Sequence, residues 1–327
     1  MDLHPRYEVQ QSSLQYRYSR YNPRHLHHRV QPMNREIDSV SQSVIVCIGP
    51  SVAGQPTQFL LERAFASQSL DWRALSVEVA EEKFGIACAG MLAMGFRGLR
   101  LFGQYESQAV TSLANGDTNS HFIGRVTSGC PADNGWQLWD NCGFAWLDCL
   151  TWNQPPPSLI WLHGDSRATR SLFVALSQVP VAPPWLWTLA PVDQAAKVLP
   201  GQIERLKTEG RLTEAETIDN TSWLQQQLMN TQGESNPPTQ KHLALVTQTA
   251  AIPDSIGGQI SDLHCPSLSM ITSHSSALPK LLAGCPLRRI GESELAVAGE
   301  AYDLLRWTGV AVDLALLRDA YDEYCDF

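Results

Sequence analysis

The chain has 327 residues, of which 43% are hydrophobic and 17% charged, so that a packed core can form and global disorder is excluded. This length suits two domains of ordinary size. The formal net charge of −9 argues against a protein that binds nucleic acid or anionic membranes through general positive charge. Lysine is scarce, and no lysine lies between Lys83 and Lys197.

The cysteines and the hydropathy favour a cytoplasmic protein. The eight cysteines form no Cys-x-x-Cys pair and no cluster with zinc spacing, so we expect buried, reduced thiols and no metal site. No apolar run is long enough to span a bilayer, and no signal peptide is evident. We therefore expect no nucleic-acid partner and no membrane partner, while the oligomeric state stays open.

Residues 1–42 differ from the rest of the chain because they are rich in Arg, His, Tyr, Gln and Ser and poor in aliphatic residues. Such a segment buries too little apolar surface to offset its ordering entropy, so we predict a disordered tail. Two alternatives stay open: an arm that binds nucleic acid, or a start placed too early, with Met33 as the native beginning and residues 1–32 not part of the protein.

The ordered chain begins with alternating strand and helix patterns. The apolar run 44–48 predicts a buried strand that ends at Gly49-Pro50, and helical spacing follows over 56–68. We predict a further strand at 74–79, a helix near 80–94 and a short strand at 99–102. This order is typical of an α/β domain with a partly parallel sheet.

A second α/β unit starts after the triple proline at 155–157. The same patterns predict strands at 158–162, 185–189 and 243–247, a helix at 167–177, a helical hairpin with a loose loop over 201–240, and two amphipathic helices at 294–307 and 312–325, broken at Thr308-Gly309.

Several motifs in this order resemble those of the shikimate dehydrogenase family, from about residue 44 to the C-terminus. They are Ile48-Gly49-Pro50, Gly95-Phe96-Arg97-Gly98-Leu99, Gly124-Arg125-Val126-Thr127-Ser128, Asp140-Asn141-Cys142-Gly143-Phe144, Gly164-Asp165-Ser166-Arg167-Ala168-Thr169-Arg170 and Trp307-Thr308-Gly309. The resemblance implies an α/β substrate-binding domain over 43–150, against which the C-terminal helix 310–327 packs back. It also implies a Rossmann-like, doubly wound domain of the NADP-binding type over 155–309.

The family reduces 3-dehydroshikimate with NADPH and uses a lysine beside an aspartate as proton donor. The resemblance places the aspartate at Asp140, but it places Glu106 where the family has its lysine, and the lysine-free stretch around it offers no replacement. Asp140 and Glu106 are therefore the catalytic candidates. A protonated Glu106 could donate a proton next to Asp140. The alternatives are that Glu106 is a solvated surface residue and that Asp140 caps a helix.

The remaining site positions are altered as well. Gln55 and Thr127 join Asp140 as candidates for binding a small hydroxy or keto acid, since they stand at positions where the family binds substrate. For NADP, the resemblance points to the turn at Gly164 and to polar residues around two strand ends. The cofactor candidates are Gly164, Ser166, Arg167, Arg170, Thr247 and Thr249.

Three hypotheses remain open at this point. The first is a shikimate dehydrogenase-like protein whose NADP-dependent catalysis is lost or strongly altered, a candidate pseudoenzyme of aromatic amino acid biosynthesis that still binds a small acid. The second is an active oxidoreductase that uses Asp140 and Glu106 on a different hydroxy acid. The third is a binding or scaffold protein without catalysis, because a fold alone does not establish activity.

Overall fold

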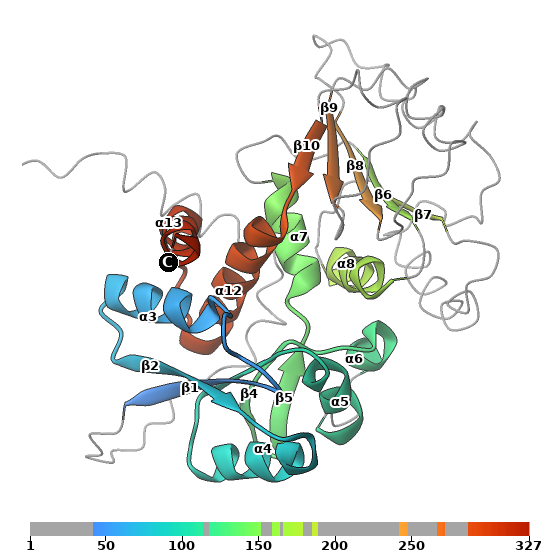
Figure 1. Cartoon of the computed structure of the whole chain (residues 1–327). Coiled ribbons are helices and arrows are strands. Elements are labelled where there is room, and N and C mark those ends of the chain that lie inside the picture. Colours follow the sequence, from blue (N-terminus) through green and yellow to red (C-terminus); the bar gives the residue numbers. More distant parts are fainter. Residues whose placement is uncertain are drawn as a thin grey trace, which may run out of the picture. The chain divides into compact units, whose positions relative to one another are not determined.

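The computed structural model describes residues 42–113, 118–151, 159–163, 166–178, 185–188, 242–247, 267–271 and 287–326 (Figure 1). These residues form two compact units. The first holds the chain up to Ala145, the short piece Gln178–Val181 and Ala296–Phe327, and the second holds Trp146–Ser177 and Ala182–Leu295. The predicted tail before Gln42 and the predicted hairpin at 201–240 lie outside the described residues.

The first unit contains a five-stranded sheet in the order β2-β1-β3-β4-β5. Strands β1 and β2 pair in parallel, as do β1 and β3, whereas β4 and β5 form an antiparallel hairpin that joins the sheet through β3. The bounds are β1 Ser43–Gly49, β2 Trp72–Glu78, β3 Gly98–Leu101, β4 Ser128–Ala132 and β5 Gly135–Trp139.

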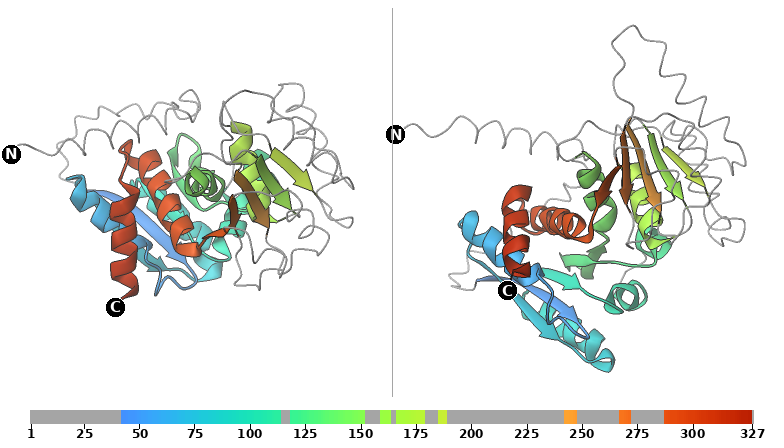
Figure 2. Two further views of the ribbon diagram at one scale, coloured as in Figure 1. Left: turned by 90° about the horizontal axis from the view of Figure 1, so that it is seen from above. Right: turned by 45° about the horizontal axis from the view of Figure 1, so that its top comes forward.

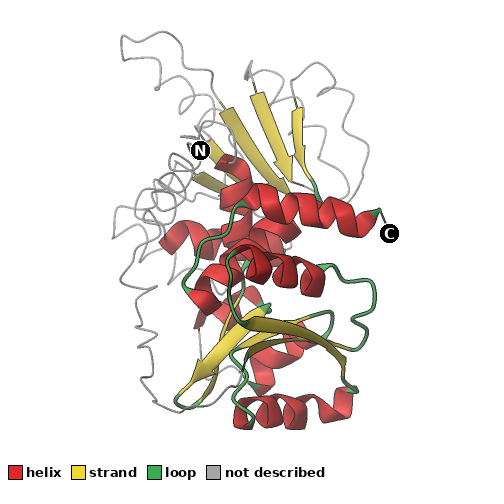
Figure 3. Cartoon of the chain, turned by 90° about the vertical axis from the view of Figure 1, so that its left-hand side faces the viewer, coloured by secondary structure: helices red, strands yellow, loops and turns green. Residues whose placement is uncertain are grey.

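Helices cover both faces of this sheet (Figure 3). On one face lie α3 (Thr57–Ser67), the part of α12 (Glu292–Thr308) that belongs to this unit, and α13 (Leu314–Cys325), which packs against α3. Figure 2 shows α13 beside α3 in both of its views. On the other face lie η1 (Glu81–Lys83), α4 (Phe84–Ala93) and α5 (Tyr105–Ser112), and α6 (Thr118–Ile123) follows α5.

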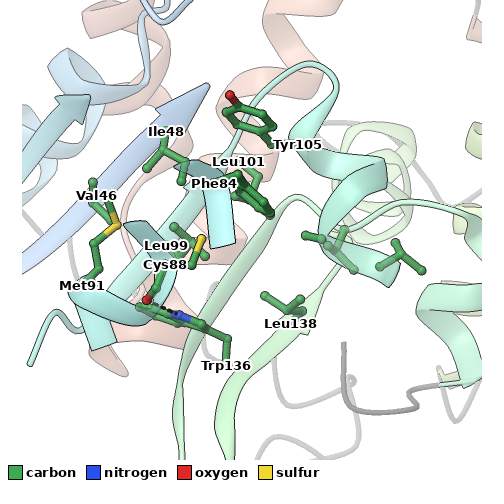
Figure 4. Packing of buried hydrophobic residues seen from close by; sticks show 13 residues of the cluster. Val46, Ile48, Phe84, Cys88, Met91, Leu99, Leu101, Tyr105, Trp136 and Leu138 are labelled. Carbon is green, nitrogen blue, oxygen red and sulfur yellow. Dashed lines mark hydrogen bonds between the residues drawn. The ribbon is translucent and has the colours of Figure 1, made fainter. Parts of the chain in front are cut away.

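The core between the sheet and α4 consists of aliphatic and aromatic side chains (Figure 4). The rings of Phe84 and Tyr105 stack with centroids 4.5 Å apart, and the Trp136 indole donates a hydrogen bond of 3.0 Å to the carbonyl of Cys88. Alternate residues of β1, Val46 and Ile48, face this core. Full burial of each such side chain contributes about 1.5–3 kcal/mol relative to exposure, which is why the apolar run 44–48 forms a central strand.

Trp307 fastens the end of α12 to the sheet. Its indole nitrogen donates to the carbonyl of Gly129 at 2.9 Å, and its ring lies so close to Gly98 that a Cβ there would be 2.9 Å from the indole nitrogen. The helix then ends at Gly309, whose φ of +73° suits glycine, and Asp313 caps α13 by accepting from the Ala315 amide. In the Trp-Thr-Gly motif, the tryptophan therefore holds α12 against the sheet and the glycine ends the helix.

The second unit contains a five-stranded sheet in the order β10-β9-β8-β6-β7, with every pair parallel. Its strands are β6 Leu159–His163, β7 Trp185–Thr188, β8 His242–Thr247, β9 Ser267–Ile271 and β10 Leu287–Ile290, and α8 (Arg167–Gln178) follows β6. The first strand of the unit, β6, lies inside the sheet, with β7 on one side and β8, β9 and β10 in succession on the other, which is doubly wound topology. The predicted α/β fold class, with a Rossmann-like second part, is confirmed.

The predicted strands and helices within the described residues correspond to observed elements within a few residues. The predicted helix that Asp140 could cap is α7 (Cys142–Thr151), whereas the sequence patterns missed α5, α6, the β4–β5 hairpin, β9 and β10. In the part of the chain that the structure describes, no helix combines the length and the apolar character that crossing a membrane requires.

Candidate functional site

Asp140, which follows β5, pairs with Arg125, which precedes β4. The Arg125 Nε lies 3.1 Å from Asp140 Oδ1. The side chain of Asp140 is fully buried, whereas 17% of the Arg125 side chain is exposed, so solvent reaches the side chain of Arg125 and not that of Asp140. Burial alone would lower the pKa of Arg125, but Cys142, Asp140 and Glu106 outweigh it and raise the pKa above its usual value.

Glu106 lies in the first turn of α5 and is half-buried. Its carboxylate contributes to the raised pKa values of both Arg100 and Arg125. Its backbone carbonyl accepts a hydrogen bond of 2.9 Å from the Val126 amide, which fixes the start of α5 beside the segment that carries Arg125. The position at which the resemblance expects a lysine is therefore acidic and borders an arginine.

Thr127 is buried, and both hydrogen-bonding capacities of its hydroxyl are used within the protein. It accepts a hydrogen bond from the backbone amide of Asn141 at 3.0 Å and donates one to the backbone carbonyl of Trp139 at 3.4 Å. Gln55, by contrast, is exposed in a turn whose amide donates to Val52 O at 3.2 Å. Of the three predicted substrate-binding residues, Thr127 and Asp140 are thus engaged in internal contacts, and Gln55 is open to solvent.

Cys142 begins α7 next to the same cluster. Burial raises the pKa of its thiol, Arg125 opposes this rise, and Asp140 and Glu106 add to it. A protonated thiol is a poor nucleophile, so nothing here favours cysteine chemistry.

A buried polar network connects this region to α12. The Asn141 side chain donates to Asp303 Oδ2 at 2.6 Å and to the Gly299 carbonyl at 3.2 Å. Arg100 on β3 lies 3.1 Å from Glu300 and donates to the Thr127 carbonyl at 3.0 Å. The Asn141 contacts also explain Gly299, because a Cβ there would lie 3.2 Å from the Asn141 amide nitrogen.

The cofactor candidates lie in the second unit, near the end of β6. Ser166 caps α8: its hydroxyl accepts from the Thr169 amide at 3.1 Å, while the Ser166 amide donates to the Thr169 hydroxyl at 2.9 Å. Arg167 is exposed and Arg170 half-buried on α8. Parallel pairing of β6 and β8 sets the last residue of β8, Thr247, beside His163 at the end of β6. Gly164 and Thr249 lie outside the described residues.

The residues that sequence reasoning missed are mostly charged partners from distant segments. Arg125 and Asn141 entered the sequence analysis only as members of motifs, and Arg100, Glu300 and Asp303 did not enter it. One signal was present: Glu300, Asp303 and Trp307 recur at helical spacing in the predicted helix 294–307, so a buried tryptophan puts both carboxylates on a buried face. Among the described residues, no cluster of three or more His, Cys, Asp or Glu side chains could hold a metal ion.

The fold is that of two-domain shikimate dehydrogenases and related reductases. The chain is similar to shikimate 5-dehydrogenase from Listeria monocytogenes, solved with shikimate and NAD, with 12% identity, a TM-score of 0.61 and coverage of 86% of this chain and 96% of that one. It is similar to the Thermus thermophilus enzyme, solved with NADP(H) and shikimate, with 14% identity, a TM-score of 0.59 and coverage of 86% and 99%.

A further similar structure has a different activity in its name. It is the 5-ketofructose reductase of Gluconobacter sp. strain CHM43, with 14% identity, a TM-score of 0.61 and coverage of 87% of this chain and 99% of that chain. No protein-family model matches the sequence. No curated protein matches it either. At these identities the likeness establishes the fold, and activity has to be argued from the site.

Proposed function

We propose that this chain is a protein of the shikimate dehydrogenase fold that binds a small hydroxy or keto acid in its first unit and has lost the reduction of 3-dehydroshikimate by NADPH. The observation that carries the proposal is the 3.1 Å ion pair of Arg125 and Asp140, in which the aspartate is buried and the arginine is partly exposed. Arginine offers a planar set of donors that suits a carboxylate ligand.

The same pair argues against proton transfer. A lysine can give up its proton near neutral pH when its surroundings lower its pKa, but a guanidinium keeps its proton. Here the neighbouring carboxylates raise the pKa of Arg125 further. The pair therefore keeps the charges of a lysine–aspartate site without its proton donor, which supports binding and opposes catalysis.

The second unit supports the loss of cofactor use. Phosphates at a helix N-terminus need free donors, yet Ser166 and Thr169 use their hydroxyls and amides on each other at the start of α8. The Ser166 and Thr169 hydroxyls at this end of α8 are thus engaged with each other rather than free to bind a phosphate.

The alternative is an active oxidoreductase in which Glu106 donates the proton beside Asp140. This role requires a protonated carboxyl next to two guanidinium groups, whereas nearby positive charges favour the ionised form. The geometry therefore ranks it second.

Thermal unfolding of the purified full chain tests the proposal. We expect shikimate to raise the unfolding midpoint of the wild type and of the surface control Arg318→Ala, but not of Arg125→Ala, and NADPH to raise none of them. We also expect no NADPH oxidation with 3-dehydroshikimate. An equal shikimate shift in Arg125→Ala would contradict the role of Arg125, and a response to no small acid at all would favour the scaffold hypothesis.

A gain-of-function variant separates lost catalysis from altered catalysis. Glu106→Lys combined with Arg125→Ala restores a lysine at the family position and removes the competing guanidinium. If cofactor use is also lost, this double variant stays inactive. If the double variant oxidises NADPH and the wild type does not, the protein lacks only the lysine side chain that catalysis needs.

A further inference from the structure

Two carboxylates of α12 are buried against the sheet of the first unit, with one cation between them. Glu300 is 1% exposed and Asp303 is fully buried, and they lie three residues apart on one face of the helix. The Arg100 Nε from β3 lies 3.1 Å from Glu300 Oε1 and 3.9 Å from Asp303 Oδ2. One guanidinium thus serves two carboxylates in a place from which water is excluded.

The hydrogen bonds around Asp303 join α12 to the sheet at three points. Its Oδ1 accepts a hydrogen bond from the Trp139 indole at 2.7 Å. Its Oδ2 accepts from the side-chain amide of Asn141 at 2.6 Å and from the Ser128 hydroxyl. Both of its oxygens are therefore engaged. These three hydrogen bonds hold α12 against β4, β5 and the segment after β5.

Glu300 is satisfied on one side alone. Its Oε1 accepts from the Thr57 hydroxyl at 3.0 Å and from Arg100, whereas its Oε2 is buried and has no hydrogen-bond partner in the described structure. A buried ionised oxygen without a partner is costly, and this cost falls when the carboxyl pair holds a proton.

Among the residues that the structure describes, the other groups near the cluster do not supply a second cation. Burial raises the pKa of the Cys47 thiol on β1, so it is neutral, and Glu106 adds a further negative charge near Arg100. Arg306 stacks over the Trp139 ring at 4.2 Å from its centroid, and Arg125 is paired with Asp140. With both α12 carboxylates ionised, the Arg100–Glu300–Asp303 cluster would carry an excess negative charge.

We propose that Glu300 and Asp303 share one proton in the native protein and that loss of this proton weakens the fastening of α12 to the sheet. In support, burial and Glu300 raise the pKa of Asp303 to about 7, against the opposing effect of Arg100. The inference does not depend on the proposed function. It reaches the candidate site through Asn141, the neighbour of Asp140, which Asp303 holds in place.

The sign of the pH dependence follows from the raised pKa. The native state binds a proton that the unfolded state has already lost, so this stabilisation is complete below about pH 4 and declines until the native pKa is passed. One proton changes the opening equilibrium at most about tenfold per pH unit in this window. Hydrogen exchange of the α12 peptide at 292–308, corrected for the intrinsic pH dependence of exchange, measures this directly on the full chain.

We expect the protection of α12 in the wild type to fall as pH rises from about 5 to about 7 and then to level off. Glu300→Gln keeps the acceptor for Thr57 and Arg100 and removes the effect of the Glu300 charge on Asp303, so its profile should be shallower than that of the wild type, while the burial of Asp303 keeps part of the slope. Glu323→Gln, in the exposed pair with Arg63, is the matched control and should keep the wild-type slope. A flat wild-type profile, or a wild-type slope in Glu300→Gln, would overturn the proposal. The wild-type profile decides the matter even if that variant does not fold.

Discussion

Arg100 is the cation on which the α12 contacts depend, so its removal gives the sharpest test of the polar core. In Arg100→Met, Glu300 and Asp303 lose their shared guanidinium while the methionine fills much of the space. Removing one partner of a buried ion pair typically costs about 3–5 kcal/mol, because the remaining charge is left without compensation. The variant also loses the 3.0 Å bond to the Thr127 carbonyl.

For a unit of this size, such a loss corresponds to a fall of about 6–20 °C in the unfolding midpoint. Differential scanning calorimetry at neutral pH measures it. Arg63→Met removes an arginine from the exposed pair with Glu323 and should cost about 1 kcal/mol or less.

The loss should also depend on pH and on Glu300. In mildly acidic buffer the carboxyl pair binds protons more readily, so the penalty of Arg100→Met should shrink. Adding Glu300→Gln should recover part of the stability at neutral pH. The reasoning is refuted if Arg100→Met unfolds within about 1 kcal/mol of the Arg63→Met control, since no buried charge would then need compensation.

Two further predictions concern packing and thiol chemistry. Gly98→Ala should destabilise the first unit by about 1–3 kcal/mol in urea titrations, because the added Cβ would lie 2.9 Å from side-chain atoms of Ile45 and Trp307. The control Gly90→Ala, in helix α4, meets open space and should leave the stability unchanged or raise it. At neutral pH, iodoacetamide should alkylate the exposed Cys325 in the native protein and leave Cys47 unmodified until the protein unfolds, since burial raises the pKa of the Cys47 thiol. Modification of Cys47 before unfolding would contradict this prediction.

The sequence predicted the elements whose patterns repeat along one segment. Apolar runs located β1 and β6, and helical spacing located α3, α8 and α12. The β4–β5 hairpin was missed although its signal is local: the turn-forming residues Asp133 and Asn134 are followed by Gly135, whose φ is +124°. Short helices such as α6 carry too few residues to show a period.

The site was less predictable for a physical reason. Asp140 was found through its motif, but its partner Arg125 stands 15 residues away on another segment, and Arg100 meets Glu300 across 200 residues. Ion pairs of this kind depend on strand order and on the face that each side chain occupies. Neither the spacing of residues nor the composition of the sequence predicts such ion pairs. The absence of lysine from 84 to 196 remains informative, because it fits a site in which arginine supplies the positive charge.

The central claim is that Arg125 holds the position of the cation beside Asp140 and makes the first unit a binder of small acids rather than a reductase. Calorimetric titration of shikimate into the wild type and Arg125→Ala, with NADPH oxidation followed in parallel, tests it most directly. We predict binding that the variant loses, and no oxidation of NADPH in either protein. Steady NADPH consumption by the wild type with 3-dehydroshikimate would contradict the claim.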